Sequence, residues 1–293
     1  GDAPTIQVIP DQADAEWVRK RSRSEMLRAF YNAAEPISWA GHDGEIVYGL
    51  YSAPGNSDFE SSGAPPLIVK VHGGPTSQSH DSFSAEAQFY TTRGYGFLEV
   101  NHRGSTGYGR AYREMLNGAW GVYDVEDSAS GAQHLVDQGL ADARRLVILG
   151  GSAGGYTVLQ SLVNKPGFWR AGVCLYGISN LFTLALNDEW KFEARYLDKL
   201  FGTLPEAEAV YRERSALFNA EKIRDAVIVF QGEDDPVVPK AQADSIVAAL
   251  RRGGVPHEYH VFAGEGHGWR KPETIERYYH LTVAFLQQYV IFG

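Results

Sequence analysis

Short apolar runs alternate with longer amphipathic stretches along most of the chain. The apolar runs cover residues 67–71, 96–100, 146–149, 171–175, 227–230 and 258–262, and stretches with helical periodicity lie near 82–93, 124–138, 154–165, 240–252 and 273–290. Apolar runs of this length suit strands that are buried on both faces. The alternation therefore predicts an α/β fold, with a mostly parallel central sheet and helices on both faces.

Three segments depart from this pattern. Apolar and polar residues alternate in 37–39 and 45–51 around a His42-Asp43-Gly44 turn, which predicts an antiparallel hairpin. Residues 1–34 are expected to form an N-terminal arm that packs on a neighbouring domain or partner, and 35–293 to form one domain. The aromatic and charged stretch 181–222 predicts a small helical insertion over one edge of the sheet.

Composition and charge exclude several classes of protein. Lys plus Arg number 27 and Asp plus Glu number 36, and the resulting net charge of −9 argues against nucleic-acid binding as the main task. The single Cys174 excludes an internal disulfide and a cysteine-based zinc site, and its apolar surroundings predict a buried core residue. No apolar stretch is long enough for a membrane span, and no signal peptide opens the sequence, so we expect a soluble, cytoplasmic protein without membrane partners.

The strongest local signal is Gly150-Gly151-Ser152-Ala153-Gly154, a G-x-S-x-G motif between a predicted strand and a predicted helix. In this context the motif forms a tight turn that exposes the serine hydroxyl above the sheet. A phosphate-binding loop would need a following Lys-Ser or Lys-Thr, and a dinucleotide-binding loop would come after the first parallel strand. Ser152 is therefore the candidate nucleophile.

A serine nucleophile needs a histidine base, and the base needs an acid that orients it. His267 lies in the glycine-rich loop after the last predicted strand, where open α/β sheets place their sites, and it is the candidate base. The preceding strand leads into Glu233-Asp234-Asp235-Pro236. We choose Asp235 because Pro236 stiffens the chain after it, although the pattern alone leaves Asp234 open.

Acyl transfer also needs N–H donors for the oxygen that becomes negative. Ala153 follows the nucleophile at the start of a helix, and Gly74 lies in the His72-Gly73-Gly74-Pro75 loop after the strand at 67–71. The backbone N–H groups of Gly74 and Ala153 are the candidate oxyanion hole. The chemistry predicted from these residues needs no metal and no cofactor.

Together these motifs resemble the catalytic domain of the prolyl oligopeptidase family of serine peptidases, most of all its acylaminoacyl-peptidase branch. The matching segments are His72 to Pro75, Asn101 to Gly109, Gly150 to Tyr156, Gly232 to Pro239 and Gly264 to Gly268, and the resemblance spans about residues 35–290. It implies an α/β-hydrolase fold with a Ser152, Asp235 and His267 triad, since the family's aspartate stands three residues before a valine. The stretch around Arg103 is a family hallmark to which we assign a structural role.

The resemblance also implies the substrate class and the partners. Val237 stands where prolyl oligopeptidases proper carry an arginine, and His72 stands where dipeptidyl peptidases carry a tyrosine. Both departures favour the acylaminoacyl-peptidase branch over strict cleavage after proline. The expected partners are a short peptide substrate, an N-terminal β-propeller domain outside this chain, and further copies of the chain in a homo-oligomer.

The family's specificity pocket implies a further set of residues beside the nucleophile. It falls on Tyr176, Ile178, Leu181 and Phe182, which predicts an apolar side chain on the acyl side of the cleaved bond. The first carboxylate after them is Asp188. Two other functions stay open: a carboxylesterase on the same fold, and a binding domain that has lost its chemistry.

Overall fold

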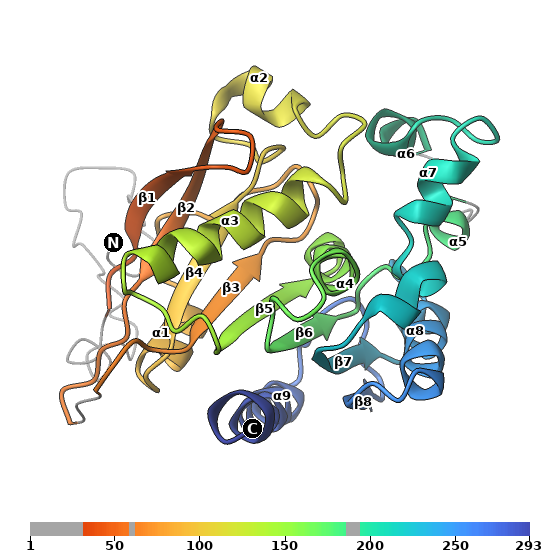
Figure 1. The fold of residues 1–293 in the computed structure, drawn as a ribbon. Helices are drawn as coiled ribbons and strands as arrows, with labels where there is room; N and C mark the ends of the chain where they lie inside the picture. The colour runs from red at the N-terminus through yellow and green to blue at the C-terminus, as the bar shows by residue number, and fades with distance from the viewer. Residues whose placement is uncertain (1–31, 59–61, 186–193) are drawn as a thin grey trace, which may run out of the picture.

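The computed structural model describes residues 32–58, 62–185 and 194–293, and these form one eight-stranded sheet (Figure 1). Nearly all of the expected N-terminal arm, and Asp188, lie outside the described residues. The strands are β1 (Glu35–Ala40), β2 (Ile46–Ser52), β3 (Leu67–Val71), β4 (Gly96–Asn101), β5 (Leu146–Gly151), β6 (Ala171–Leu175), β7 (Ala226–Gly232) and β8 (His257–Phe262). Their order in the sheet is β1-β2-β4-β3-β5-β6-β7-β8.

The sheet is parallel except at one edge. β1 and β2 form the predicted hairpin, and β2 pairs antiparallel with β4. From β4 to β8 every neighbouring pair is parallel. The predicted mostly parallel sheet is confirmed, and the carboxyl ends of β3, β5, β6, β7 and β8 share one edge of it.

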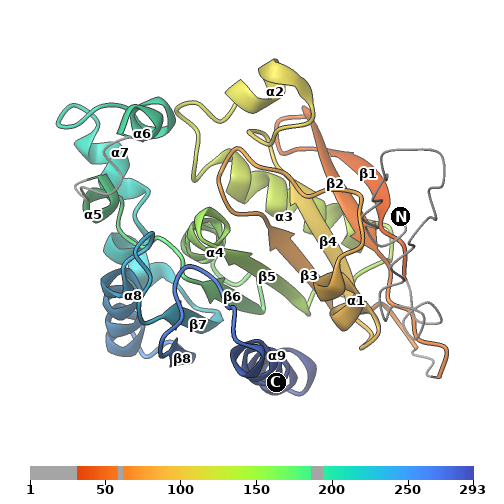
Figure 2. The same ribbon diagram turned by 180° about the vertical axis from the view of Figure 1, so that it is seen from behind.

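Helices cover both faces, as predicted. The helices are α1 (Ala85–Thr91), α2 (Gly109–Glu114), α3 (Tyr123–Asp137), α4 (Ala153–Asn164), α5 (Leu181–Ala185), α6 (Ala194–Phe201), α7 (Glu208–Glu213), α8 (Lys240–Arg252) and α9 (Pro272–Leu286), with a 3₁₀-helix η4 (Ala216–Lys222) and a π-helical end η5 (Gln287–Ile291). Buried residues of α3, α4 and α8 pack on one face of the sheet, and those of α1 and α9 pack on the other (Figure 2). The short helix α2 was not predicted.

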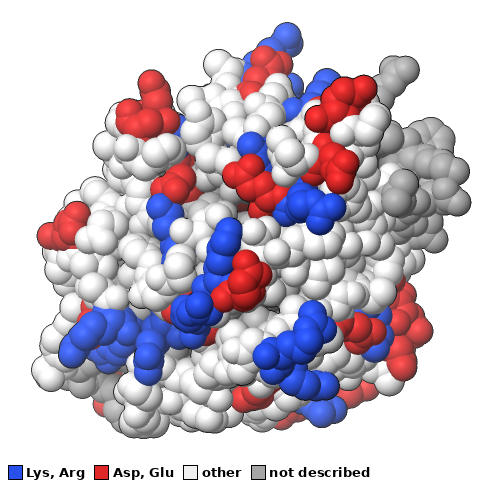
Figure 3. Space-filling model, turned by 45° about the vertical axis from the view of Figure 1, so that its right-hand side comes forward, with Lys and Arg blue, Asp and Glu red and all other residues white. Residues whose placement is uncertain are grey.

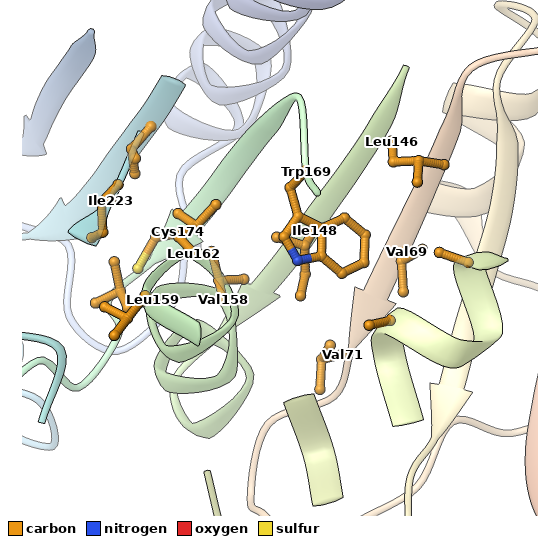
Figure 4. Packing of buried hydrophobic residues seen from close by; sticks show 14 of the residues in the cluster. Val69, Val71, Leu146, Ile148, Val158, Leu159, Leu162, Trp169, Cys174 and Ile223 are labelled. Carbon is orange, nitrogen blue, oxygen red and sulfur yellow. The ribbon is translucent and has the colours of Figure 1, made fainter. Parts of the chain in front are cut away.

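The alternation of side chains along β3 explains why a sheet with two covered faces needs apolar strands. Leu67, Val69 and Val71 point into the core beneath α3 and α4 (Figure 4), and Ile68 points into the core beneath α1 and α9. Successive residues of a strand face opposite sides of the sheet, so the residues on each side of this strand must be apolar. Cys174 lies in the first of these cores, as predicted.

The segment after β6 is helical, as predicted. Its helices α5, α6 and α7 pack in a third apolar cluster, which also contains Ala153 and Tyr156 at the start of α4 and Ile178 after β6 (Figure 1). Ala153 and Tyr156 belong to α4, which follows β5, and Ile178 belongs to the loop that follows β6. The insertion therefore stands beside the carboxyl ends of the strands, because its apolar faces are buried against α4.

Arg103 ties the hairpin to the central part of the molecule. Its buried guanidinium pairs with Asp127 on α3 at 2.6 Å and with Asp43 in the hairpin turn at 2.5 Å. The ring of Tyr123 lies 3.9 Å below the guanidinium carbon. These contacts support the structural role that we assign to Arg103.

Acidic and basic side chains are interspersed on the face shown in Figure 3, with uncharged surface between them. The net charge of −9 is therefore not gathered into one acidic field on this face. Within the ranges that the structure describes, no helix has both the length and the apolar character that a membrane span requires.

Candidate active site

Ser152 sits on a sharp turn between β5 and α4. Its backbone has φ of 59° and ψ of −121°, which is a strained conformation for a residue with a side chain. The N–H of Ser152 donates to the carbonyl of Leu175 at 3.0 Å, and the carbonyl of Ser152 accepts from Tyr156 at 3.0 Å as α4 begins. This is the geometry of a nucleophile elbow.

The glycines of the motif are required by close backbone packing. A Cβ added to Gly150 would lie 2.5 Å from the carbonyl carbon of Gly154. A Cβ on Gly154 would lie 2.2 Å from the carbonyl oxygen of Val71 in β3, and one on Gly155 would lie 2.7 Å from the Cα of Gly177. The turn can therefore form only where the sequence has glycine at these positions.

His267 and Asp235 are joined by a hydrogen bond of 2.8 Å between Nδ1 and Oδ2. His267 lies in the loop between β8 and α9, and Asp235 follows β7. The Asp235 side chain is fully buried, while the His267 side chain keeps 22% of its surface exposed. A carboxylate can only accept, so Nδ1 carries a proton, and in the neutral imidazole Nε2 would then present the lone pair that a base needs.

The loop after β7 holds the Asp235 carboxylate in place. Its Oδ1 accepts the backbone N–H groups of Val237 and Val238, each at 2.9 Å. Its Oδ2 accepts from the side-chain amide of Gln231 at 3.4 Å as well as from His267. The neighbouring Asp234 is exposed. The environment of Asp235 suits a group that orients a base, and that of Asp234 does not.

The two candidate oxyanion donors lie close to Ser152 in the structure. A Cβ added to Gly73 would lie 3.6 Å from the Cβ of Ser152, so the loop after β3 runs beside the serine. Gly74 follows with φ of +55°, a conformation that favours glycine. Ala153 lies in the first turn of α4, where a backbone N–H has no partner within the helix.

A cavity of about 570 Å³ opens beside Ser152. Gly74, Ser152 and Ala153 line it, so both candidate oxyanion donors and the candidate nucleophile belong to one site. Its other walls come from four segments: the loop after β3, the loop before α3, the loop after β6, and the insertion. They are Pro75, Thr76, Ser77, Trp120, Ile178, Tyr196 and Leu197.

Tyr176 packs directly on the candidate base. Its ring centroid lies 4.6 Å from that of His267 and 5.2 Å from that of Trp269. Tyr176 has φ of 38°, the other positive φ of a non-glycine residue among the described residues. Burial raises the pKa of its hydroxyl to about 12, so the group stays protonated in the neutral range.

The predicted pocket residues divide into two groups. Ile178 lines the cavity, whereas Tyr176 packs on His267 and is not one of the residues that line it. Leu181 is buried in the cluster formed by the insertion, and Phe182 packs on Tyr211 and Phe218. Neither Leu181 nor Phe182 is among the residues that line the cavity, and their place in a specificity pocket stays a prediction.

Sequence reasoning missed Trp120, Tyr196 and Leu197. The Trp120 ring stacks on Phe201 with centroids 5.1 Å apart, and the Tyr196 hydroxyl hydrogen-bonds Thr76 at 2.8 Å. Trp120 precedes α3 and Tyr196 belongs to the insertion, so no motif marks either residue. Thr76 directly follows Gly74 and Pro75 in the sequence, so its closeness to the predicted oxyanion donor could have indicated that it lines the site.

The fold and the site define the class of this protein: it is an α/β-hydrolase with a serine at its nucleophile elbow. A sequence model of the prolyl oligopeptidase family matches residues 81–291, and the chain belongs to this family of serine peptidases. The family membership expected from the motifs is confirmed.

Individual relatives support the same placement. Dipeptidyl aminopeptidase BIII of Pseudoxanthomonas mexicana is 34% identical over 86% of this chain and 38% of its own length. An acylamino-acid-releasing enzyme of Arabidopsis thaliana is 31% identical over 77% of this chain and 30% of its own length. The structure of a Mycobacterium tuberculosis puromycin-hydrolyzing peptidase is 39% identical, with a TM-score of 0.90 over 95% of this chain and 42% of that one. The chain thus spans less than half the length of each of these relatives.

Proposed function

We propose that this chain hydrolyses peptide bonds through Ser152, His267 and Asp235, with the N–H groups of Gly74 and Ala153 as the oxyanion hole. The observation that carries the proposal is the 2.8 Å bond from His267 to the buried carboxylate of Asp235, in a fold whose β5–α4 turn holds Ser152 in the elbow conformation. Such an assembly activates a serine and orients its base.

In the proposed reaction, Nε2 of His267 takes the proton of the Ser152 hydroxyl while Oγ attacks the carbonyl carbon of the substrate. The carbonyl oxygen becomes negative and receives the two backbone N–H groups. The tetrahedral intermediate then expels the amine, which takes the proton from His267, and an acyl-enzyme remains. Water repeats the sequence and releases the acid, so Asp235 stabilises the imidazolium twice in each turnover.

The cavity supports an apolar preference on the acyl side. Trp120, Ile178 and Leu197 give it apolar walls, and none of the residues that line it is charged. Burying an aliphatic or aromatic side chain there contributes about 1.5–3 kcal/mol. A lysine or arginine side chain would be buried without a counter-charge, which is costly.

The size limit to short peptides rests on the family resemblance, in which a β-propeller restricts access to the hydrolase site. We propose that the whole protein contains such a β-propeller domain. Because a solved relative is named for puromycin hydrolysis, we add puromycin to the proposed substrates. Rates of product release from peptides of increasing length test the size limit, and the rate of puromycin hydrolysis tests whether puromycin is a substrate.

Hydrolysis of an acylated phenylalanine anilide by the wild-type chain and by Ser152→Ala tests the proposed function. The wild type should release the amine, and the variant should be inactive with an unchanged thermal transition, because an elbow hydroxyl contributes little to the core. Turnover of a short p-nitrophenyl ester without turnover of the anilide would indicate an esterase instead. A folded wild type that cleaves neither substrate would indicate a domain without this chemistry.

A further inference from the structure

The loop after β3 that carries Gly74 is held by the segment that follows β4. We call residues 72–79 the oxyanion loop and residues 101–106 the supporting segment. Thr106 N–H donates to the carbonyl of Ser77 at 2.9 Å, and the Asn101 amide exchanges hydrogen bonds with the backbone of Ser79 at 2.7 and 3.1 Å. The supporting segment belongs to the hallmark stretch to which the proposed mechanism gives no chemical part.

The third link between the two segments passes through a buried histidine. His72 Nε2 lies 2.8 Å from the hydroxyl of Ser105, and His72 Nδ1 lies 3.1 Å from the carbonyl oxygen of Gly73. Ser105 is fully buried and His72 is 8% exposed. The His72 ring stacks on that of His102, with centroids 4.7 Å apart and planes 18° apart.

The chemistry of the partners sets the tautomer of His72. A carbonyl oxygen can only accept, so Nδ1 of His72 carries the proton and donates to Gly73. Nε2 of the neutral ring then accepts from the Ser105 hydroxyl. Burial lowers the pKa of His72 to about 3, so the ring is neutral in the working range and this donor arrangement persists.

The bond from His72 fixes the orientation of the Gly73–Gly74 peptide. The carbonyl of Gly73 and the N–H of Gly74 belong to the same planar trans peptide and point in opposite directions. When His72 holds the Gly73 carbonyl on one side, the Gly74 N–H must face the other. On the far side of Gly74, its own carbonyl accepts the Ser77 N–H at 2.6 Å. Both peptides that flank Gly74 are thereby fixed.

We propose that His72 and Ser105 are positioning residues that aim the Gly74 N–H at the developing oxyanion, with the Ser105 hydroxyl holding Nε2 of the ring whose Nδ1 binds Gly73. The inference rests on the proposed function, because it takes Gly74 as an oxyanion donor. It assigns the supporting segment a role in the rate of reaction in addition to its structural one. Neither residue touches the substrate.

Two substitutions of His72 distinguish the roles of its two ring nitrogens. In His72→Asn the side-chain amide can occupy the place of Nδ1 and donate to Gly73. In His72→Gln the amide reaches the place of Nε2 and Ser105, and the donor to Gly73 is lost. Ser105→Ala removes only the hydroxyl that holds Nε2 of the ring. Loss of a complete oxyanion donor lowers kcat by about 10²–10³-fold, so a misdirected donor should lower it by roughly 10–100-fold.

The experiment measures kcat and KM for the acylated phenylalanine anilide, together with the affinity for a phenylalanine peptide aldehyde, whose adduct places an oxygen in the oxyanion hole. His72→Gln should lower kcat and aldehyde affinity by similar factors and leave KM within about threefold. Ser105→Ala should show a smaller loss of the same kind, and His72→Asn should recover most of kcat.

Equal kcat values for the Gln and Asn variants, or losses that appear in KM alone, would overturn the positioning role. If a His72 variant does not fold, Ser105→Ala decides, and full kcat in that variant contradicts the proposal. Wild type and Ser152→Ala are measured in the same series. An inactive wild type overturns the proposed function, whereas an active wild type with unaffected His72→Gln and Ser105→Ala variants overturns only this inference.

Discussion

The two adjacent aspartates after β7 have opposite environments, and this difference has a direct kinetic consequence. Asp235 is buried, receives two backbone N–H groups and binds His267, whereas Asp234 is exposed. The pattern of residues alone did not separate them. Their burial does, because an acid that orients an imidazole must itself be held still.

Asp235→Asn should therefore lower kcat by about 10⁴-fold, because an amide in this position stabilises the wrong tautomer of His267. Asp234→Asn is the matched control, with the same chemical change one residue away, and it should leave kcat nearly unchanged. Steady-state kinetics on the phenylalanine anilide measure both. A large loss in the Asp234 variant together with a small one in the Asp235 variant would move the acid to position 234.

At the scale of elements, the elbow depends on how closely β3, β5 and α4 approach one another. Gly154→Ala would place a methyl group 2.2 Å from the Val71 carbonyl, and rigid backbone must shift to admit it. Overpacking of this kind costs about 1–3 kcal/mol. Denaturant unfolding should show a loss of at least this size in the free energy of unfolding.

Gly253→Ala is the control for that measurement. Gly253 ends α8 with φ of −77°, and the nearest atom to an added Cβ lies 3.5 Å away. The same glycine-to-alanine change should therefore be neutral or slightly stabilising there. Equal losses at the two positions would mean that the contact with Val71 does not determine the cost.

The cavity wall is also a property of elements, because the insertion and the loop before α3 meet over Ser152. Its apolar lining predicts that kcat/KM is higher for Phe or Leu on the acyl side than for Lys or Arg. A series of anilides that differ only in this residue measures the preference. Efficient cleavage after Lys or Arg, with poor cleavage after Phe and Leu, would show that the specificity pocket lies elsewhere.

At the scale of the whole molecule, one buried carboxyl links stability to pH. Asp124 on α3 accepts the Gly121 N–H and the Thr157 hydroxyl, each at 2.6 Å. Burial raises its pKa from 3.8 to about 6. Between these values the folded state binds more protons than the unfolded state, so ionisation of Asp124 lowers the free energy of unfolding as the pH rises.

Asp124→Asn removes this titration. The difference between the two pKa values corresponds to about 3 kcal/mol. The free energy of unfolding of the variant, relative to that of the wild type, should therefore rise by up to about 3 kcal/mol between pH 4 and pH 7. Urea titrations of both proteins across this range measure it. A difference that stays constant with pH would contradict the raised pKa.

Much of the molecule follows from local sequence, and the rest depends on contacts that no local pattern contains. The parallel strands, the hairpin and the elbow were predictable because apolar periodicity and the glycines around Ser152 act on neighbouring residues. The positions of Tyr196 and Trp120 were not, since the insertion and the loop before α3 reach the cavity only through tertiary packing. Leu181 and Phe182 pack within the insertion and do not line the cavity, which the sequence could not show because an apolar side chain fits a pocket and a helical core equally well.

The most direct test of the central claim is the site of covalent attachment of a fluorophosphonate probe, mapped by mass spectrometry of the digested protein. We predict one adduct per chain, on Ser152, with no labelling of Ser152→Ala and greatly slowed labelling of His267→Ala. Labelling of the folded wild type at another serine, or no labelling at all, would contradict it.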